Sequence, residues 1–166
     1  VPILFDREKI PGTLSEYLSK NGHKQLKIAE TEKYAHVTYF FNGGAEKPFE
    51  GEERILIDSP KEVATYDQKP EMSAYKVLEQ LERKLDEQNI SLYVVNFANP
   101  DMGGHTGNYE ATIKAMEVID ECIKKLSDKC LENNISMLIT ADHGNADQMT
   151  HEDSSAHTSH SKAAVP

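Results

Sequence analysis

The sequence lacks the features that mark membrane, secreted and nucleic-acid-binding proteins. No stretch approaches the roughly 18 consecutive apolar residues that a membrane-spanning helix needs, and the first residues do not combine a basic region with an apolar signal segment. Positive charge is scarce, with 18 Lys and Arg against 28 Asp and Glu and a formal net charge of −10. Such a chain opposes a nucleic-acid backbone, whose binding depends on clustered Lys and Arg. We therefore expect a cytoplasmic protein with neither membrane nor nucleic acid among its partners.

Cysteine is also scarce, because Cys122 and Cys130 are the only two in the 166 residues. Both fall in a stretch with a helical pattern, where a rise of about 1.5 Å per residue separates their Cα atoms by roughly 12 Å. That separation is beyond the reach of a disulfide bond. We expect two reduced thiols.

What the chain does contain is a regular alternation of helical and extended patterns. Capping signals or apolar residues at three- and four-residue steps predict helices at 13–21, 34–41, 73–88 and 108–133. Short apolar runs predict strands at 26–29, 91–98 and 136–141, with 55–57 as a further candidate. Helices and strands that alternate with short connections indicate an α/β fold, a mostly parallel sheet with helices on both faces.

Two of the predicted strands lead into residues that can bind metal. One strand end is followed by Asp101 and His105, and the next by Asp142 and His143. Reactive groups collect beyond the carboxyl ends of parallel strands, so these four residues are expected to lie together. Carboxylate and neutral imidazole suit Zn, Mn or Fe, and two such pairs can hold two cations about 3.5 to 4 Å apart for phosphoryl chemistry. We predict a binuclear metal site.

A polar turn is the competing interpretation of each pair. One isolated Asp-x3-His pattern is more often a turn or the start of a helix, because short motifs match by chance. Two pairs at two strand ends favour the metal site. Gly103, Gly104 and Gly144 beside the candidate ligands allow close backbone approach and positive φ, although ordinary turns would also account for them.

Several longer segments are unusual enough to indicate a family. They are AETEKYAHV at 29–37, ATYDQKPEMS at 64–73, NFANPDMGGHTG at 96–107, TADHGN at 140–145 and HTSH at 157–160. Together they resemble the carboxyl-terminal part of a cofactor-independent (2,3-bisphosphoglycerate-independent) phosphoglycerate mutase, over nearly the whole chain. The resemblance implies an alkaline-phosphatase-like fold and interconversion of 3-phosphoglycerate and 2-phosphoglycerate through a phosphoserine intermediate. It also implies two divalent cations, first Mn2+ and otherwise Zn2+, Co2+ or Mg2+, with no organic cofactor.

The same resemblance assigns roles to individual residues. Asp101, His105 and His160 correspond to the three protein ligands of one cation. Asp142 and His143 correspond to half of the ligand set of the other cation. The rest of that set, an early Asp and the nucleophilic Ser, lies upstream of the matching region in the family.

The remaining candidates are a lysine and a second histidine. Lys33 corresponds to the family's phosphate-contacting lysine; without the surrounding match it would be interpreted as a solvated helix lysine. His157 is close enough to His160 in sequence to compete for its ligand role. The other histidines are assigned to solvent or local hydrogen bonding: His23, His36 and His151.

The resemblance also implies that much of the enzyme is missing. Residues 1–166 are interpreted as part of a phosphatase-like metal-binding domain, without the amino-terminal strand, the catalytic serine and the inserted domain that holds the glycerate carboxylate. We therefore predict that the chain alone is inactive as a mutase. In the family the missing strand lies inside the sheet, so we also expect unpaired strand edges that favour self-association or domain swapping.

Two other functions remain open at this point. One is another enzyme of the same metal-dependent phosphatase superfamily, such as a phosphopentomutase or phosphodiesterase, although the segment 66–73 argues against it. The other is a non-catalytic fragment, scaffold or exported antigen in which the histidines are incidental. Replacing His105 by Ala separates the classes, because only a ligand role predicts weaker cation binding.

Overall fold

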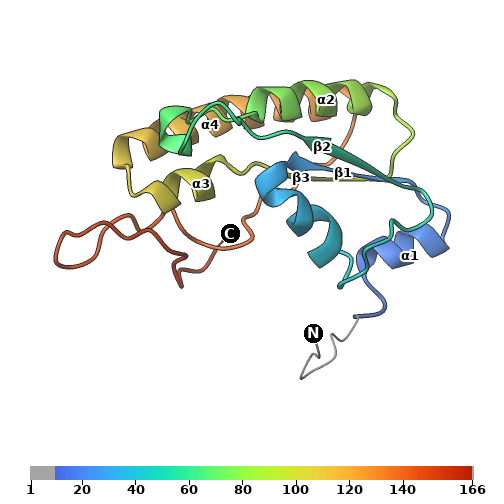
Figure 1. The fold of residues 1–166 in the computed structure, drawn as a ribbon. Coiled ribbons are helices and arrows are strands. Elements are labelled where there is room, and N and C mark those ends of the chain that lie inside the picture. The colour runs from blue at the N-terminus through green and yellow to red at the C-terminus, as the bar shows by residue number, and fades with distance from the viewer. Residues whose placement is uncertain (1–9, 166) are drawn as a thin grey trace.

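Three parallel strands form the centre of the molecule, which is seen in a computed structural model that describes residues 10–165 (Figure 1). They are β1 (Gln25–Glu30), β2 (Glu52–Ile57) and β3 (Leu92–Asn96), in the spatial order β2-β1-β3. Every residue of the central strand β1 is buried, whereas the residues of β3 are only partly covered. Because β1 pairs in parallel with both β2 and β3, the carboxyl ends of all three strands lie at the same edge of the sheet.

Helices cover both faces of this sheet, as the alternating pattern predicted. Helices α2 (Ala74–Asp86) and α4 (Tyr109–Glu132) pack together on one face, and α1 (Leu14–Lys20) and η2 (His36–Phe40) lie on the other (Figure 1). The core forms between the sheet and the apolar stripes of α2 and α4, where Cys122 and Cys130 are buried free thiols as predicted. Within residues 10–165, no helix has the length and apolar character needed to cross a bilayer.

The remaining helical segments lie around the carboxyl ends of the strands. Helix η1 (Thr31–Lys33) follows β1 directly, η3 (Tyr66–Gln68) lies between β2 and α2, and α3 (Asn99–Thr106) follows β3. The helix predicted at 34–41 is present, but residues 36–40 wind as a π-helix. Helix α3 was not predicted, and it packs against α4.

The strand predicted at 136–141 is not formed. The segment makes no sheet ladder, and Leu138 within it is 93% exposed. An apolar run becomes a strand only when a neighbouring strand pairs with it, and among the described residues β3 pairs with β1 alone. A cavity of about 430 Å³ separates β3 from this segment, lined by Val95 and Phe97 on one side and Met137 and Ile139 on the other.

Candidate metal centre

The structure brings all six predicted site residues together at the carboxyl end of the sheet. Lys33 ends the turn of η1 after β1, and Asp101 and His105 lie on α3 after β3. The other three belong to the segment that follows α4. Contacts of 4.0 Å or less connect the whole set: Lys33, Asp101, His105, Asp142, His143 and His160.

Asp101, His105 and His160 form the first group of potential ligands. Asp101 and His105 are four residues apart on α3 and so project from the same side of that helix. Oδ1 of Asp101 lies 3.1 Å from Nε2 of His105 and 3.3 Å from Nε2 of His160. The three donor atoms all lie within 4.8 Å of one another, close enough to share one ion.

The hydrogen bonding of His105 leaves its inward nitrogen available as a ligand. Nδ1 of His105 lies 2.7 Å from the carbonyl oxygen of Thr158. A carbonyl oxygen only accepts, so Nδ1 carries the proton and donates it, and in the neutral ring Nε2 presents a lone pair toward Asp101. Two acceptors that face each other at 3.1 Å require a proton or a cation between them. The donor set therefore fits a divalent first-row cation.

Lys33 supplies the positive charge next to these groups. Its side chain is buried, with a residue exposure of 3%, and Nζ lies 2.6 Å from Oδ2 of Asp101. The same nitrogen lies 3.2 Å from Nε2 of His143 and 3.9 Å from Oδ2 of Asp142. Lys33 is therefore not a solvated helix lysine, because it lies between two carboxylates at the centre of the site.

The carboxyl group of Asp101 is held in its charged form. Burial by itself raises the pKa of Asp101, but hydrogen bonds from Lys33 and Asn145 outweigh it, and the pKa lies below its ordinary value. Oδ2 of Asp101 accepts from the lysine, while Oδ1 faces His105 and His160. A negatively charged oxygen that faces two imidazole nitrogens provides three donor atoms for a cation.

Asn145 is a polar neighbour of Asp101 that the sequence patterns did not assign to the site. Its Nδ2 donates to Oδ1 of Asp101 at 2.6 Å and to the backbone oxygen of Asp101 at 3.1 Å. A Cβ atom on Gly104 would lie 2.3 Å from Oδ1 of Asn145, so a larger residue there would displace the Asn145 side chain. The predicted close approach is thus confirmed at Gly104, and at Gly144, where a Cβ would meet Ser161 Oγ at 2.3 Å. The expectation of a positive φ at these glycines was wrong, since neither Gly104 nor Gly144 has one.

Asp142 and His143 lie beside the first group and begin a second one. Nε2 of His143 is 3.7 Å from Oδ2 of Asp142. The imidazole of His143 stacks on that of His160, with ring centroids 3.7 Å apart and an angle of 24° between the planes. The two potential cation sites are therefore adjacent.

The sequence pattern assigns His36 to solvent or local hydrogen bonding. The structure places it instead beside Asp142 and His143. Nε2 of His36 lies 3.9 Å from Oδ2 of Asp142, and the two residues form a donor group with His143. Burial, with a smaller effect of nearby Lys33, places the pKa of His36 below its ordinary value. Its position one helical turn after Lys33 is the sequence signal that could have identified it.

His160 rather than His157 reaches the metal-binding group. The imidazole of His157 packs edge to face on His151, with ring centroids 4.7 Å apart. His160 contacts the rings of both His105 and His143. The geometry thus favours His160 over its close neighbour as the potential ligand.

Comparison with known proteins agrees with this chemistry. The family model described as "Metalloenzyme superfamily" matches residues 3–166. The chain belongs to the metalloenzyme superfamily. The superfamily name covers metal-dependent enzymes, and the donor groups described above lie within the matched region.

Curated relatives narrow the resemblance to one kind of superfamily member. A 2,3-bisphosphoglycerate-independent phosphoglycerate mutase of Clostridium botulinum (strain ATCC 19397 / Type A) is 58% identical over 90% of this chain and 29% of its own length. The same enzyme of Clostridioides difficile (strain 630) is 57% identical over the whole chain and 32% of its own length. The resemblance predicted from sequence motifs is confirmed, and the chain spans about a third of the length of these relatives.

A solved structure confirms the fold. A phosphoglycerate mutase of Leishmania mexicana, determined at low cobalt concentration, superposes with a TM-score of 0.85 and 32% sequence identity. The match covers 91% of this chain and 30% of that chain. The incomplete α/β sheet predicted from the sequence thus matches part of a larger mutase.

Proposed function

We propose that residues 1–166 form part of the phosphatase-like metal-binding domain of a phosphoglycerate mutase that interconverts 3-phosphoglycerate and 2-phosphoglycerate. One observation carries the proposal. Asp101, His105 and His160 direct three donor atoms to one point within 4.8 Å, in a chain that is 57% identical over its full length to a mutase of this kind. Relatives of that identity favour a mutase over a phosphopentomutase, a phosphodiesterase or a non-catalytic scaffold.

The proposed cation ligands are the residues that the sequence predicted. Asp101, His105 and His160 hold one divalent cation, and Asp142 and His143 contribute to the second. The resemblance to the mutases implies Mn2+ first, with Zn2+, Co2+ or Mg2+ as alternatives and no organic cofactor, and mixed carboxylate and imidazole ligands suit first-row divalent cations. When bound, these cations supply positive charge that stabilises a transferring phosphoryl group.

Lys33 and Asn145 act on that chemistry without binding a cation themselves. The ammonium of Lys33, fixed within 3.9 Å of both carboxylates, is positioned to contact a phosphate oxygen of phosphoglycerate. Asn145 holds Asp101 in place by donating one hydrogen bond to its carboxylate and one to its backbone oxygen. Both residues preorganise positive charge and ligand geometry before substrate arrives.

The proposal also covers what the chain does by itself. The phosphoryl group passes through a phosphoserine in the intact enzyme, and the serine concerned is contributed by another part of the mutase. We propose that residues 1–166 alone bind cation but do not turn over phosphoglycerate, that the enzyme acts in the cytoplasm, and that the free edge of β3 promotes self-association.

Cation binding is tested by thermal unfolding with and without Mn2+ after treatment with a chelator. An ion present at 100 times its dissociation constant stabilises the wild-type chain by about 2.7 kcal/mol. We expect His105→Ala to lose most of this stabilisation, whereas His151→Ala, an exposed histidine outside both donor groups, keeps it. Equal stabilisation of the His105→Ala and wild-type chains would contradict the proposed ligand role.

Mutase activity is tested in the same preparations. Wild-type chain, Mn2+ and 3-phosphoglycerate are incubated, and 2-phosphoglycerate is measured. We expect no product above the background without protein. Product that disappears in the His105→Ala variant would show that the chain holds its own nucleophile and would overturn the proposed inactivity.

A further inference from the structure

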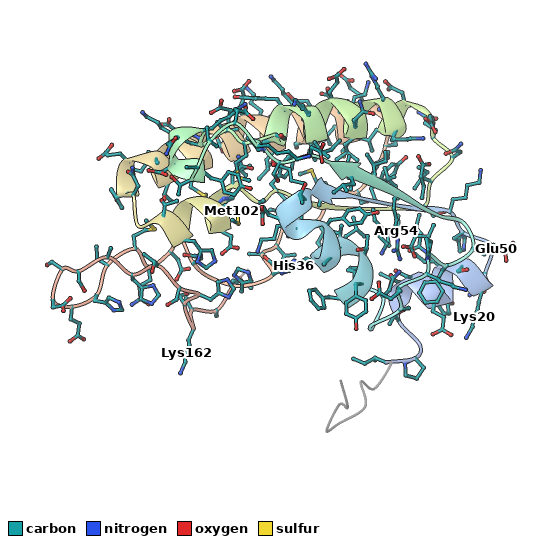
Figure 2. All side chains as sticks on the ribbon, viewed as in Figure 1. Lys20, His36, Glu50, Arg54, Met102 and Lys162 are labelled. Carbon is teal, nitrogen blue, oxygen red and sulfur yellow. The ribbon has the colours of Figure 1, made fainter. Side chains whose placement is uncertain are left out.

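His36 lies against the incomplete second group of ligands. Figure 2 labels it on η2, the short helical segment beside the sheet. Its Nε2 atom is 3.9 Å from Oδ2 of Asp142, and Nε2 of His143 is 3.7 Å from the same oxygen. The fold thus brings a residue from the first quarter of the chain to two residues more than a hundred positions later.

The three donor atoms have the spacing of ligands that share an ion. All of them lie within 4.8 Å of one another. Metal–ligand bonds of about 2.0 to 2.2 Å hold neighbouring donors roughly 3 to 4 Å apart. The separations of 3.7 and 3.9 Å fall in that range, so a cation would need only small side-chain movements.

The position of the His36 ring is fixed by its own surroundings. The imidazole packs edge to face on Phe40, one turn along η2, with ring centroids 5.3 Å apart. Its Nδ1 atom is buried without a hydrogen-bond partner among the described residues. Nε2 is therefore the ring nitrogen directed at the carboxyl group of Asp142.

We propose that His36 is the third protein ligand of a cation held by Asp142 and His143. The inference rests on the proposed function, in which those two residues bind a cation. It adds a ligand that lets residues 1–166 hold a second ion with no group from elsewhere. Two imidazoles and one carboxylate favour Mn2+, Zn2+ or Co2+ over Ca2+ and Mg2+, which prefer oxygen ligands.

Lys33 makes this second site weaker than the first. Its ammonium lies 3.2 Å from Nε2 of His143 and 3.9 Å from Oδ2 of Asp142. The ammonium of Lys33 repels a divalent cation at those atoms. In the first group, Lys33 contacts Oδ2 of Asp101, whereas Oδ1, the other carboxylate oxygen, faces the imidazole of His105. Titration should therefore resolve one tight and one weaker ion.

Calorimetric titration of the metal-free chain with Mn2+ tests the inference. The variants are His36→Ala and His36→Gln, the second of which keeps most of the side-chain volume in case the first does not fold. We expect two ions in the wild-type chain, and at least tenfold weaker binding of the second ion in both variants, with the first ion unchanged. The matched control is His23→Ala, an exposed histidine between α1 and β1.

Two further variants separate failure of the inference from failure of the proposed function. His105→Ala should weaken the tight ion, and Asp142→Asn should weaken the second. If His36→Gln binds two ions with wild-type affinity while Asp142→Asn loses the second, His36 is not a ligand and the inference is overturned. A single ion that is lost in His105→Ala also overturns it and leaves the first site standing. No ion in the wild-type chain overturns both.

A spectroscopic measurement gives a readout specific to the ligand role. Bound Zn2+, which is diamagnetic, shifts the 15N signal of the imidazole nitrogen that coordinates it and leaves the signals of the other rings sharp. We expect the Nε2 signal of His36 to shift as the second equivalent of Zn2+ is added, after that of His105. A His36 Nε2 signal that does not shift through both equivalents would overturn the inference, even if the substitutions altered binding indirectly.

Discussion

Glu30 is a carboxyl group buried at the point where β1 ends. Its side chain has no exposure to solvent, and Oε1 accepts a hydrogen bond from the backbone N–H of Ser73. Burial raises the pKa of Glu30 to about 7 from the 4.5 of the free group, although the hydrogen bond from Ser73 opposes this. Between pH 4.5 and about 7, Glu30 is therefore mostly protonated in the folded chain and mostly charged in the unfolded chain.

This preference predicts how stability depends on pH. The contribution of Glu30 is complete below pH 4.5 and is lost as the pH rises to about 7, which corresponds to about 3 kcal/mol of unfolding free energy. We expect Glu30→Gln to remove that decline, so that it gains stability relative to wild type between pH 5 and about 7.5. Urea unfolding at several pH values measures it. Glu50→Gln, at an exposed site (Figure 2), is the control and should follow wild type.

A parallel wild-type and Glu30→Gln profile would contradict the assigned pKa. The comparison is informative because the amide can still accept the hydrogen bond from Ser73. A variant that is less stable at every pH by the same amount would show that packing at this site, rather than ionisation, determines the effect.

At the scale of elements, α3 is positioned by its fit against the segment after residue 141. Gly104 allows the side chain of Asn145 to reach Asp101, because a Cβ atom there would lie 2.3 Å from Oδ1 of Asn145. Gly103, the preceding residue of α3, faces Thr112 of α4, and its Cβ would meet Oγ1 of that side chain at 3.3 Å. The two neighbouring glycines therefore have different reasons to be small.

Gly104→Ala and Gly103→Ala form a matched pair. Alanine favours a helix over glycine by about 1 kcal/mol at either position. We expect Gly103→Ala to change stability by less than about 1 kcal/mol, because a threonine hydroxyl can adjust. Gly104→Ala should displace Asn145, cost about 1 to 3 kcal/mol and weaken Mn2+ binding. Thermal unfolding with and without Mn2+ measures both, and equal behaviour of the pair would contradict the role given to Asn145.

The elements also show where the sequence was informative and where it was not. The strong apolar stripes of α2 and α4 and the apolar runs of β1 and β3 predicted those four elements, because burial of one face determines them. Helix α3 was not predicted because Pro100, Gly103 and Gly104 are residues that disfavour helices. The spacing of an Asp and a His four residues apart is the one helical signal in the segment. The strand predicted at 136–141 was wrong, because a strand forms only where a neighbouring strand pairs with it. The pattern of side chains in the segment does not show whether such a neighbour is present.

The candidate site was predictable to a similar degree. Residue type and position after a strand end indicated Asp101 and His105, which follow β3, as candidate ligands. Asp142 and His143 also lie at the site, although the strand expected before them is not formed. His36 and Asn145 were not assigned, because their roles arise from contacts across more than forty residues of chain. The choice between His157 and His160 likewise required the folded loop.

For the whole molecule, the edge of β3 that pairs with no described strand and the apolar cavity next to it form one surface. The cavity of about 430 Å³ is lined by Val95, Phe97, Met137 and Ile139, and Leu138 beside it is 93% exposed. Exposed apolar side chains next to an unpaired strand edge favour contact with another chain. We expect the purified chain to scatter light with a mass above the 18.6 kDa of one copy.

Leu138→Asp tests whether this surface carries the association. Its side chain is outside the core, so the variant should fold, and its apparent mass should fall toward 18.6 kDa at equal concentration. Leu131→Asp is the matched control, because Leu131 is 73% exposed near the end of α4 and should associate as wild type does. A wild-type mass of 18.6 kDa at all concentrations would refute the expectation.

The parallel order of the strands places the opposite end of the sheet away from the candidate metal centre. The turn before β1, the turn after α2 and the end of α4 meet there, joined by hydrogen bonds from Ser91 to Lys24 and from Gln88 to Asn133. A fluorescent dye or a surface linker attached at that end would be the full length of the sheet away from the candidate metal ligands. Binding of ions and phosphate compounds can therefore be followed on immobilised or labelled protein without disturbing what is being measured.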